Sequence, residues 1–218
     1  ACAGFVTALD IASKYIAADG QYRHILVVGA YAMSKHLNKM DKKTVTLFAD
    51  GAGAMVLKAV GSEDKSGFLA SELLSKGEYN EWMGIYGGGT KMPTTEQTLV
   101  SHDHQLKFVK RFPPTLNPEI WTGMIERLNK RIGVKSRDVD HYFITQININ
   151  SIMDTMDRLN VDRNKAATIM HYYGYTGSAC IPMAFNEVWE RGDINAGDLV
   201  YFVGSGGGLS FASAAFRI

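Results

Sequence analysis

A cysteine near the start of the chain is the strongest candidate for chemistry in this sequence. Cys2 stands among small residues, directly before residues 5–16, whose apolar positions repeat at helical spacing. A thiol at a helix N-terminus lies near unpaired N–H groups and the positive end of the helix dipole, and both favour the nucleophilic thiolate. The alternative is a structural cysteine, because free cysteines are often buried. The pattern therefore predicts either a nucleophile or a core residue.

A glycine run near the other end of the chain is a second candidate. Residues 204–208 (GSGGG) lie between two apolar segments, without the Lys-Ser/Thr of a P-loop or the strand–helix context of a dinucleotide site. Backbone N–H groups in such a run can face a developing oxyanion, and the alternative is a permissive turn. His102 and His104 offer metal-ligand chemistry without an obvious third partner, so we expect a solvated loop and no metal site.

The composition limits the classes of protein to which the chain can belong. It has 218 residues, 46% of them hydrophobic, enough to bury the core of one domain or two small ones. The 23 Lys and Arg residues nearly balance the 22 Asp and Glu residues, so we expect no nucleic-acid partner. No apolar run is long enough to span a bilayer, so we expect no membrane partner. A reactive thiol and the lack of a signal-peptide pattern predict a cytoplasmic protein.

The apolar periodicity predicts helices alternating with strands, which is typical of the α/β class. We expect helices over residues 5–19, 118–132, 149–161 and 179–191, and strands over 24–32, 67–75, 141–147, 198–206 and 209–218. The run 24–32 is continuously apolar, which favours burial on both faces. Residues 45–60 are interpreted as two β-like runs around a turn at 50–53. A glycine run and two adjacent prolines within 77–117 favour a boundary there.

Five segments carry motif-like sequence in a fixed order: ACAGF (1–5), LFADGAGAMVL (47–57), DVDHYFITQIN (138–148), YGYTGSACIP (173–182) and GSGGGLSFASAAFRI (204–218). Together they resemble the β-ketoacyl-ACP synthase III family of the thiolase superfamily. The resemblance covers essentially the whole chain. It implies a thiolase-like fold of two similar halves, each a mixed sheet sandwiched between helices.

The resemblance also implies how the chain is divided and what accompanies it. Residues 1–100 correspond to the remainder of the N-terminal half, starting at the nucleophile, and residues 101–218 to the C-terminal half. Roughly the first third of a typical member is absent. We therefore expect an upstream segment or a companion chain, and assembly as a homo- or heterodimer.

The same resemblance assigns roles to site residues. Cys2 is implied as the acyl-accepting cysteine, with the N–H groups of Cys2 and Gly207 as oxyanion donors. Ile147 and Asn148 are implied to bind substrate, with Asn148 beside the pantetheine arm. The implied substrate is an acyl-CoA or acyl-carrier-protein thioester, with no cofactor. Asn150 stands where the family often has a carrier-docking arginine, and the loss of that charge favours coenzyme A or a different carrier.

Two positions depart from the family pattern. Thr145 stands in place of the usual histidine and Tyr175 in place of the usual asparagine, both of which support decarboxylative condensation in the family. Threonine has no protonation near neutral pH, and tyrosine has an ordinary pKa of about 10, so neither repeats the original role. The main hypothesis is an acyltransferase that loads Cys2 and uses Tyr175 and Thr145 to orient an acceptor. The alternative is a catalytically degenerate structural subunit of a heteromeric ketosynthase.

Overall fold

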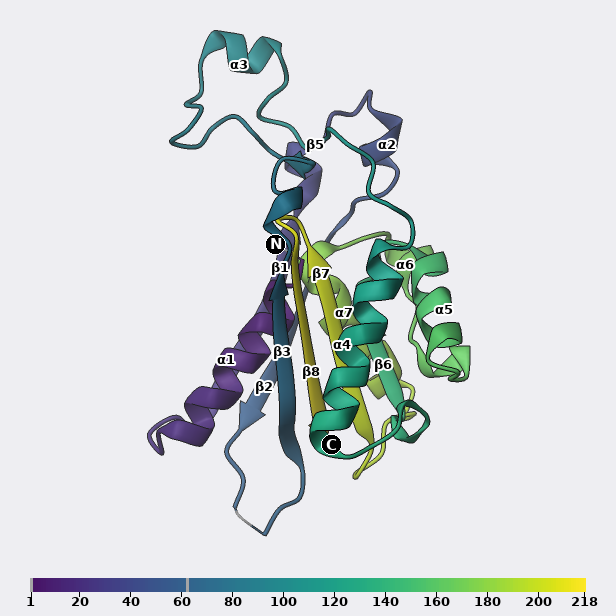
Figure 1. The fold of residues 1–218 in the computed structure, drawn as a ribbon. Coiled ribbons are helices and arrows are strands. Elements are labelled where there is room, and N and C mark those ends of the chain that lie inside the picture. The colour runs from purple at the N-terminus through teal and green to yellow at the C-terminus, as the bar shows by residue number, and fades with distance from the viewer. Residues whose placement is uncertain (1, 62) are drawn as a thin grey trace.

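The computed structural model describes residues 2–61 and 63–218, so Ala1 of the first motif lies outside the described residues. Two sheets organise the fold (Figure 1). The smaller sheet pairs β1 (His24–Ala32) with β2 (Asp50–Lys58) in antiparallel register. The larger sheet has the order β3 (Gly67–Ser75), β8 (Ser210–Arg217), β7 (Leu199–Gly206) and β6 (His141–Ile144). Only the β6–β7 pair in it is parallel, so the sheet is mixed.

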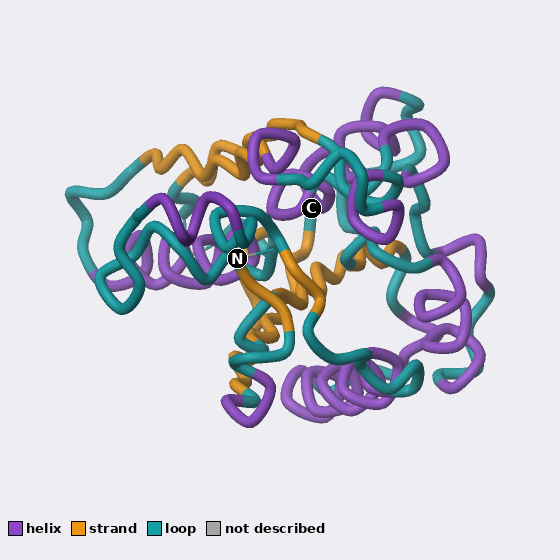
Figure 2. The backbone as a smooth tube through the Cα atoms, turned by 90° about the horizontal axis from the view of Figure 1, so that it is seen from above, coloured by secondary structure: helices purple, strands orange, loops and turns teal. Residues whose placement is uncertain are grey.

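Helices lie on both sides of the larger sheet (Figure 2). On one side, α1 (Gly4–Ala18) and α7 (Cys180–Glu190) contact this sheet and also the β1–β2 pair. On the other side, α4 (Leu116–Ile132) packs against β3 and β8, and α5 (Ile149–Arg158) packs against α4. The expected α/β class is thus confirmed, and the helices predicted over 118–132, 149–161 and 179–191 are present with ends shifted by a few residues.

Apolar burial explains these layers. One cluster of buried side chains fills the space between the two sheets around α1 and α7, and includes Phe5, Leu9 and Ile181. A second cluster lies between the larger sheet and α4, and includes Trp121, Tyr142 and Phe211. Both faces of β7 are therefore buried, as a continuous apolar strand between two helix layers requires.

The prediction that β1 is buried on both faces is wrong. Its burial alternates, and Leu26 and Val28 are exposed. The reason is that α1 covers only one face of the β1–β2 pair among the residues that the structure describes. The apolar run alone could not reveal which layer is present on the second face.

The turn predicted at residues 50–53 is also wrong, because β2 runs unbroken from Asp50 to Lys58. Its glycines serve close packing instead. Gly53 pairs with Gly29 of β1, and a Cβ at Gly53 would lie 2.9 Å from Cβ of Pro182 in α7. A Cβ at Gly29 would meet the carbonyl of Ser178. The two glycines let the β1–β2 pair approach the start of α7.

The segment between β3 and α4 forms an excursion from the body, with α3 (Glu96–Val100) at its far end (Figure 1). Its base is the short pair β4 (Met83–Gly84) and β5 (Lys107–Phe108). Two further short helices, α2 (Lys42–Val45) and α6 (Met170–Tyr173), lie in the connections near the same end of the molecule. The division of the chain at residue 100 stays a prediction. Within the described residues no helix is both long and apolar enough to cross a membrane.

Candidate active site

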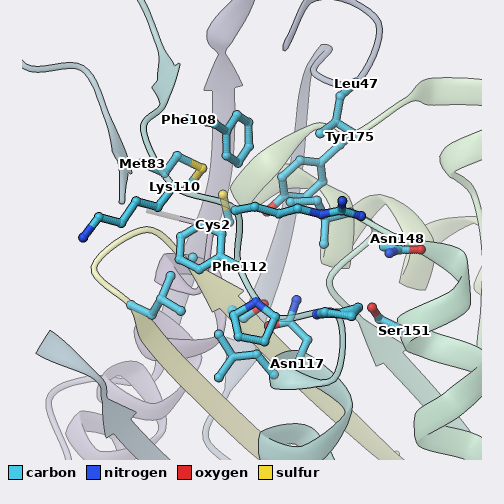
Figure 3. Close-up of a pocket in the computed structure, with 18 of the residues that line it drawn as sticks. Cys2, Leu47, Met83, Phe108, Lys110, Phe112, Asn117, Asn148, Ser151 and Tyr175 are labelled. Atoms are coloured by element: carbon cyan, nitrogen blue, oxygen red, sulfur yellow. The ribbon is translucent and has the colours of Figure 1, made fainter. Parts of the chain in front are cut away.

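Cys2 lies in the wall of a cavity with a volume of about 680 Å³ (Figure 3). The thiol is almost completely buried, with 4% of the residue exposed. The cavity is built around it by the residues that follow β6, the end of β7, the connection before β2, and residues 109–114, which follow β5 and are called the strap. The lining residues that carry the argument are Cys2, Leu47, Phe108, Ile147, Asn148 and Tyr175.

The start of α1 fixes the position of Cys2. The N–H and the hydroxyl of Thr7 both donate to the carbonyl of Ala3, at 3.0 and 3.1 Å, which closes the first helical turn. A Cβ at Gly204 of β7 would lie only 3.0 Å from Cα of Ala3. The glycine therefore allows the helix N-terminus to approach the end of β7, and this contact holds Cys2 at the cavity.

Tyr175 lies next to Cys2 and lines the same cavity (Figure 3). The backbone of Tyr175 accepts from the N–H of Ala49 at 2.9 Å and donates to the carbonyl of Leu47 at 3.0 Å. Its ring packs against Phe48, with 5.4 Å between centroids. Burial raises the pKa of the Tyr175 phenol well above its ordinary value, and the neighbouring Cys2 thiol adds to this effect. The Tyr175 hydroxyl therefore keeps its proton near neutral pH and can donate a hydrogen bond.

Burial governs the protonation of Cys2, the candidate nucleophile. It raises the pKa of the Cys2 thiol, and hydrogen bonds with Tyr175 and with Tyr31 of β1 only partly oppose this effect. The position before a helix alone led to the expectation of a thiolate. The structure corrects this expectation, since the desolvation of a buried sulfur outweighs the stabilising contacts.

Thr145 lies behind the cavity wall and is not among its lining residues. It is fully buried, its N–H donates to the carbonyl of Val203 at 2.9 Å, and its hydroxyl oxygen accepts from the N–H of Ser205 at 2.8 Å. Because β6 ends at Ile144, this side chain continues the hydrogen-bond ladder to β7. Thr145 is thus not among the residues that line the cavity with Cys2 and Tyr175, and its expected role toward an acceptor stays a prediction.

The other predicted site residues lie at or near the cavity. Ile147 and Asn148 line it, and the Asn148 side chain caps α5 by accepting from the N–H of Asn150 at 3.0 Å. Gly206 also lines the cavity, and Gly207 follows it in the turn to β8. The role of Gly207 as an oxyanion donor stays a prediction.

The strap is basic and aromatic, and its place at the cavity was not predicted from the sequence. Lys110, Arg111 and Phe112 line the cavity together with Lys43, and no carboxylate is among the lining residues. The N–H groups of Val109 and Lys110 donate to the Trp82 carbonyl at 2.8 and 3.2 Å, and these hydrogen bonds hold the strap in place. The ammonium of Lys110 also lies 5.3 Å from the Trp82 ring centroid. The available signal was the Lys-Arg-Phe triplet before two prolines, in a segment interpreted only as a boundary.

The described residues offer no set of side chains that could ligate a metal ion. In residues 2–61 and 63–218, no group of three or more His, Cys, Asp or Glu side chains could hold an ion. The His102 and His104 rings lie 6.2 Å apart, in the excursion that carries α3.

Comparison with known proteins adds to this geometry. The family model described as 3-oxoacyl-[acyl-carrier-protein (ACP)] synthase III matches residues 1–77, and the model of its C-terminal part matches residues 129–218. A β-ketoacyl-[acyl-carrier-protein] synthase III of Aliarcobacter butzleri is 32% identical over 217 residues, and one of Natranaerobius thermophilus is 34% identical over 219 residues. The chain belongs to the 3-oxoacyl-[acyl-carrier-protein] synthase III family. The resemblance inferred from the five motifs is confirmed.

Solved structures of synthase III proteins confirm the thiolase-like fold. The structure from Aquifex aeolicus VF5 superposes with a TM-score of 0.85 at 29% identity, and that from Thermus thermophilus with 0.87 at 26% identity. Each covers 100% of this chain, and this chain covers 65% of each. The chain likewise spans 65% and 66% of the two curated relatives. The homologous proteins are thus longer than the chain described here.

Proposed function

We propose that this chain carries the acyl-accepting site of a synthase III-type acyltransferase, with Cys2 as the nucleophile. The observation that supports this most is the position of Cys2, buried in the wall of a cavity of about 680 Å³ in a protein of this family. Apolar side chains that suit an acyl chain, among them Leu47, Phe108 and Ile147, line the cavity together with the basic side chains of the strap.

The proposed loading step is a thioester exchange. Cys2 Sγ attacks the carbonyl carbon of an acyl thioester, a new C–S bond forms, and the C–S bond to the carrier breaks. The proton of the Cys2 thiol ends on the released carrier thiol, so the exchange needs no cofactor. Tyr175 donates a hydrogen bond to Cys2 and so favours the thiolate in the attacking state.

The donor is proposed to be acyl-CoA or an acylated carrier protein. Lys43, Lys110 and Arg111 line the cavity without any carboxylate, which suits the phosphate groups that both donors carry. We further propose that an upstream segment or companion chain completes the protein, because the relatives are longer than this chain. A homo- or heterodimer is proposed from the family resemblance alone.

The step after loading is less constrained by this site. Among the described residues, no histidine lines the cavity. Thr145 stands at the usual histidine position, and its hydroxyl oxygen already accepts a hydrogen bond from the Ser205 N–H. We therefore propose that the acyl group passes from Cys2 to an acceptor, and that this transfer does not use decarboxylative condensation by the usual route. The same observation supports a second candidate function, a catalytically degenerate subunit that supports an active partner.

Incubation of the natural full-length protein with a panel of acyl-CoA thioesters, followed by intact mass measurement, tests the proposal. We expect a gain of one acyl group, which Cys2→Ser abolishes and Cys180→Ser retains, because Cys180 is fully buried in α7. No acylation from any donor, with the fold intact, would favour the degenerate subunit. Equal labelling of the Cys2→Ser variant would remove Cys2 as the nucleophile.

A further inference from the structure

A fully buried amide side chain lies directly before two residues of the candidate site. Gln146 follows Thr145 after the end of β6 and has no exposed surface. Ile147 and Asn148, the next two residues, line the cavity that also contains Cys2. Gln146 itself is not among the lining residues. Its side chain can therefore act on the site only through the backbone that it holds in place.

The carboxamide of Gln146 makes three hydrogen bonds, all with backbone groups. Its Nε2 donates to the carbonyls of Ile144 and Ala167, each at 2.9 Å. Its Oε1 accepts from the N–H of Ile169 at 2.8 Å. The N–H of Ala167 in turn donates to the carbonyl of Tyr142 in β6 at 3.1 Å. The two N–H donors and the oxygen of the amide are thus all paired, and they fasten this segment to the end of β6, an edge strand of the larger sheet.

The fastened segment continues through α6 to Tyr175, which lines the same cavity. Ile169 directly precedes α6, and the N–H groups of Tyr172 and Tyr173 both donate to its carbonyl at 3.1 Å. The amide of Gln146 therefore sets the start of this single turn. The backbone pairing of Tyr175 with the connection before β2 sets its far end.

The backbone of Gln146 contacts a third part of the chain. Its N–H donates to Sγ of Cys180 at 3.4 Å, and Cys180 is the first residue of α7. This second cysteine is fully buried. One residue thus joins the end of β6, the segment before α6 and the start of α7.

We propose that Gln146 is a positioning residue for the acyl loading of Cys2, and that its carboxamide fixes both the cavity residues that follow it and the segment that leads to Tyr175. A side-chain amide suits this place because it pairs two carbonyls and one N–H at once. A carboxylate would turn acceptors toward both carbonyls, and an apolar side chain would leave all three backbone groups without this partner. The positioning role rests on the proposed function, whereas the hydrogen bonds do not.

The test compares Gln146→Met with the unaltered protein, both as the natural full-length chain. Methionine keeps the length of the side chain and removes its three hydrogen bonds. We expect the rate of acyl loading from saturating acyl-CoA to fall about ten- to a hundredfold, because a misplacement of about 1 Å at a reacting group costs a factor of this order. Hydrogen exchange of residues 166–175, measured on peptides, should become faster in the same variant.

Asn129→Leu is the matched control. Asn129 is a buried amide of α4 that does not line the cavity, and its side chain donates to Ser136 and accepts from Tyr201, both at 2.8 Å. We expect this variant to lower the free energy of unfolding but to leave acyl loading and the exchange of residues 166–175 unchanged. An equal loss of loading in the control would overturn the proposal. Loading by folded Gln146→Met at the unaltered rate would overturn it too.

A second variant protects the test against misfolding. Gln146→Glu keeps the oxygen that accepts from Ile169 and replaces the nitrogen that donates to two carbonyls, so we expect slower loading and faster exchange of residues 166–175 here as well. Unchanged loading by this variant would also overturn the proposal. If the unaltered protein loads no acyl group, the proposed function fails by itself. Faster exchange in the variants would then retain the contacts of Gln146, whereas unchanged exchange would reject them as well.

Discussion

The contacts of Thr145 lead to a prediction that separates a structural role from a catalytic one. Thr145→Val keeps the shape of the side chain and removes the oxygen that accepts from the Ser205 N–H at 2.8 Å. Since Thr145 is fully buried, no water replaces that oxygen, and a buried N–H loses its partner. An unsatisfied buried donor costs about 1–3 kcal/mol, so the free energy of unfolding should fall by that amount.

Thr155→Val is the matched control for this change. Thr155 is equally buried in α5, but its hydroxyl donates at 2.7 Å to the carbonyl of Ser151, which the helix already uses as an acceptor. Its replacement leaves no backbone group unpaired and should cost less than about 1 kcal/mol. Both variants are measured by urea denaturation of the full-length protein, followed by circular dichroism.

Acyl loading then decides what Thr145 does. We expect the folded Thr145→Val protein to load acyl groups at the rate of the unaltered protein, because Thr145 does not line the cavity. Unchanged stability together with lost loading would refute the reasoning, and would indicate that Thr145 contacts the substrate.

Four further predictions concern packing, the ionisation of Cys2 and Cys180, and the charge of the substrate. Gly53→Ala places a Cβ 2.9 Å from Pro182 and should lower the free energy of unfolding by about 1–3 kcal/mol in urea denaturation. Gly61→Ala is the control, because open space surrounds Gly61, and it should not destabilise the fold. Equal stabilities of the two variants would contradict the packing argument. Burial raises the pKa of Cys2, so its acyl loading should increase as pH rises beyond the ordinary cysteine range of about 8.5; a loading rate that is flat from pH 6 to 9 would contradict this. Burial raises the pKa of Cys180 to about 12, so peptide mapping should find it unalkylated at pH 9 in the folded protein. Lys110→Ala should raise KM for acyl-CoA about two- to fivefold. It should leave KM for an acyl N-acetylcysteamine thioester unchanged, because that donor has no phosphate; equal effects on both donors would argue against phosphate contact.

Much of the larger sheet and its helices could be predicted from the sequence, because each segment carries a strong local signal. β7 is a continuous apolar run and lies between two helix layers, as such a run indicates. The helix at 118–132 shows helical spacing and ends at Gly133, which has a left-handed conformation. Local pattern and tertiary packing agree in these elements.

The β1–β2 pair was harder to predict, because its glycines are required by contacts with residues that are distant in sequence. Gly53 was interpreted as a turn residue, but its lack of a side chain allows β2 to pack closely against Pro182 of α7. No local pattern encodes that contact. The exposed face of β1 has the same origin, since the burial of a strand depends on layers that its own residues do not specify.

For the candidate site, the motifs located Cys2, Tyr175 and Asn148 on one cavity but not their environment. The position before a helix indicated a thiolate, and only the structure shows the desolvation that raises the pKa of Cys2. The basic strap was missed because irregular segments carry no periodic signal.

The measurement that tests the central claim most directly is the mass of the peptide containing Cys2, after rapid mixing of the full-length protein with an acyl-CoA and acid quenching. The account predicts up to one acyl equivalent on Cys2 and none on Cys180. Release of coenzyme A while the Cys2 peptide stays unmodified would contradict it, and so would an acyl group found only on another residue.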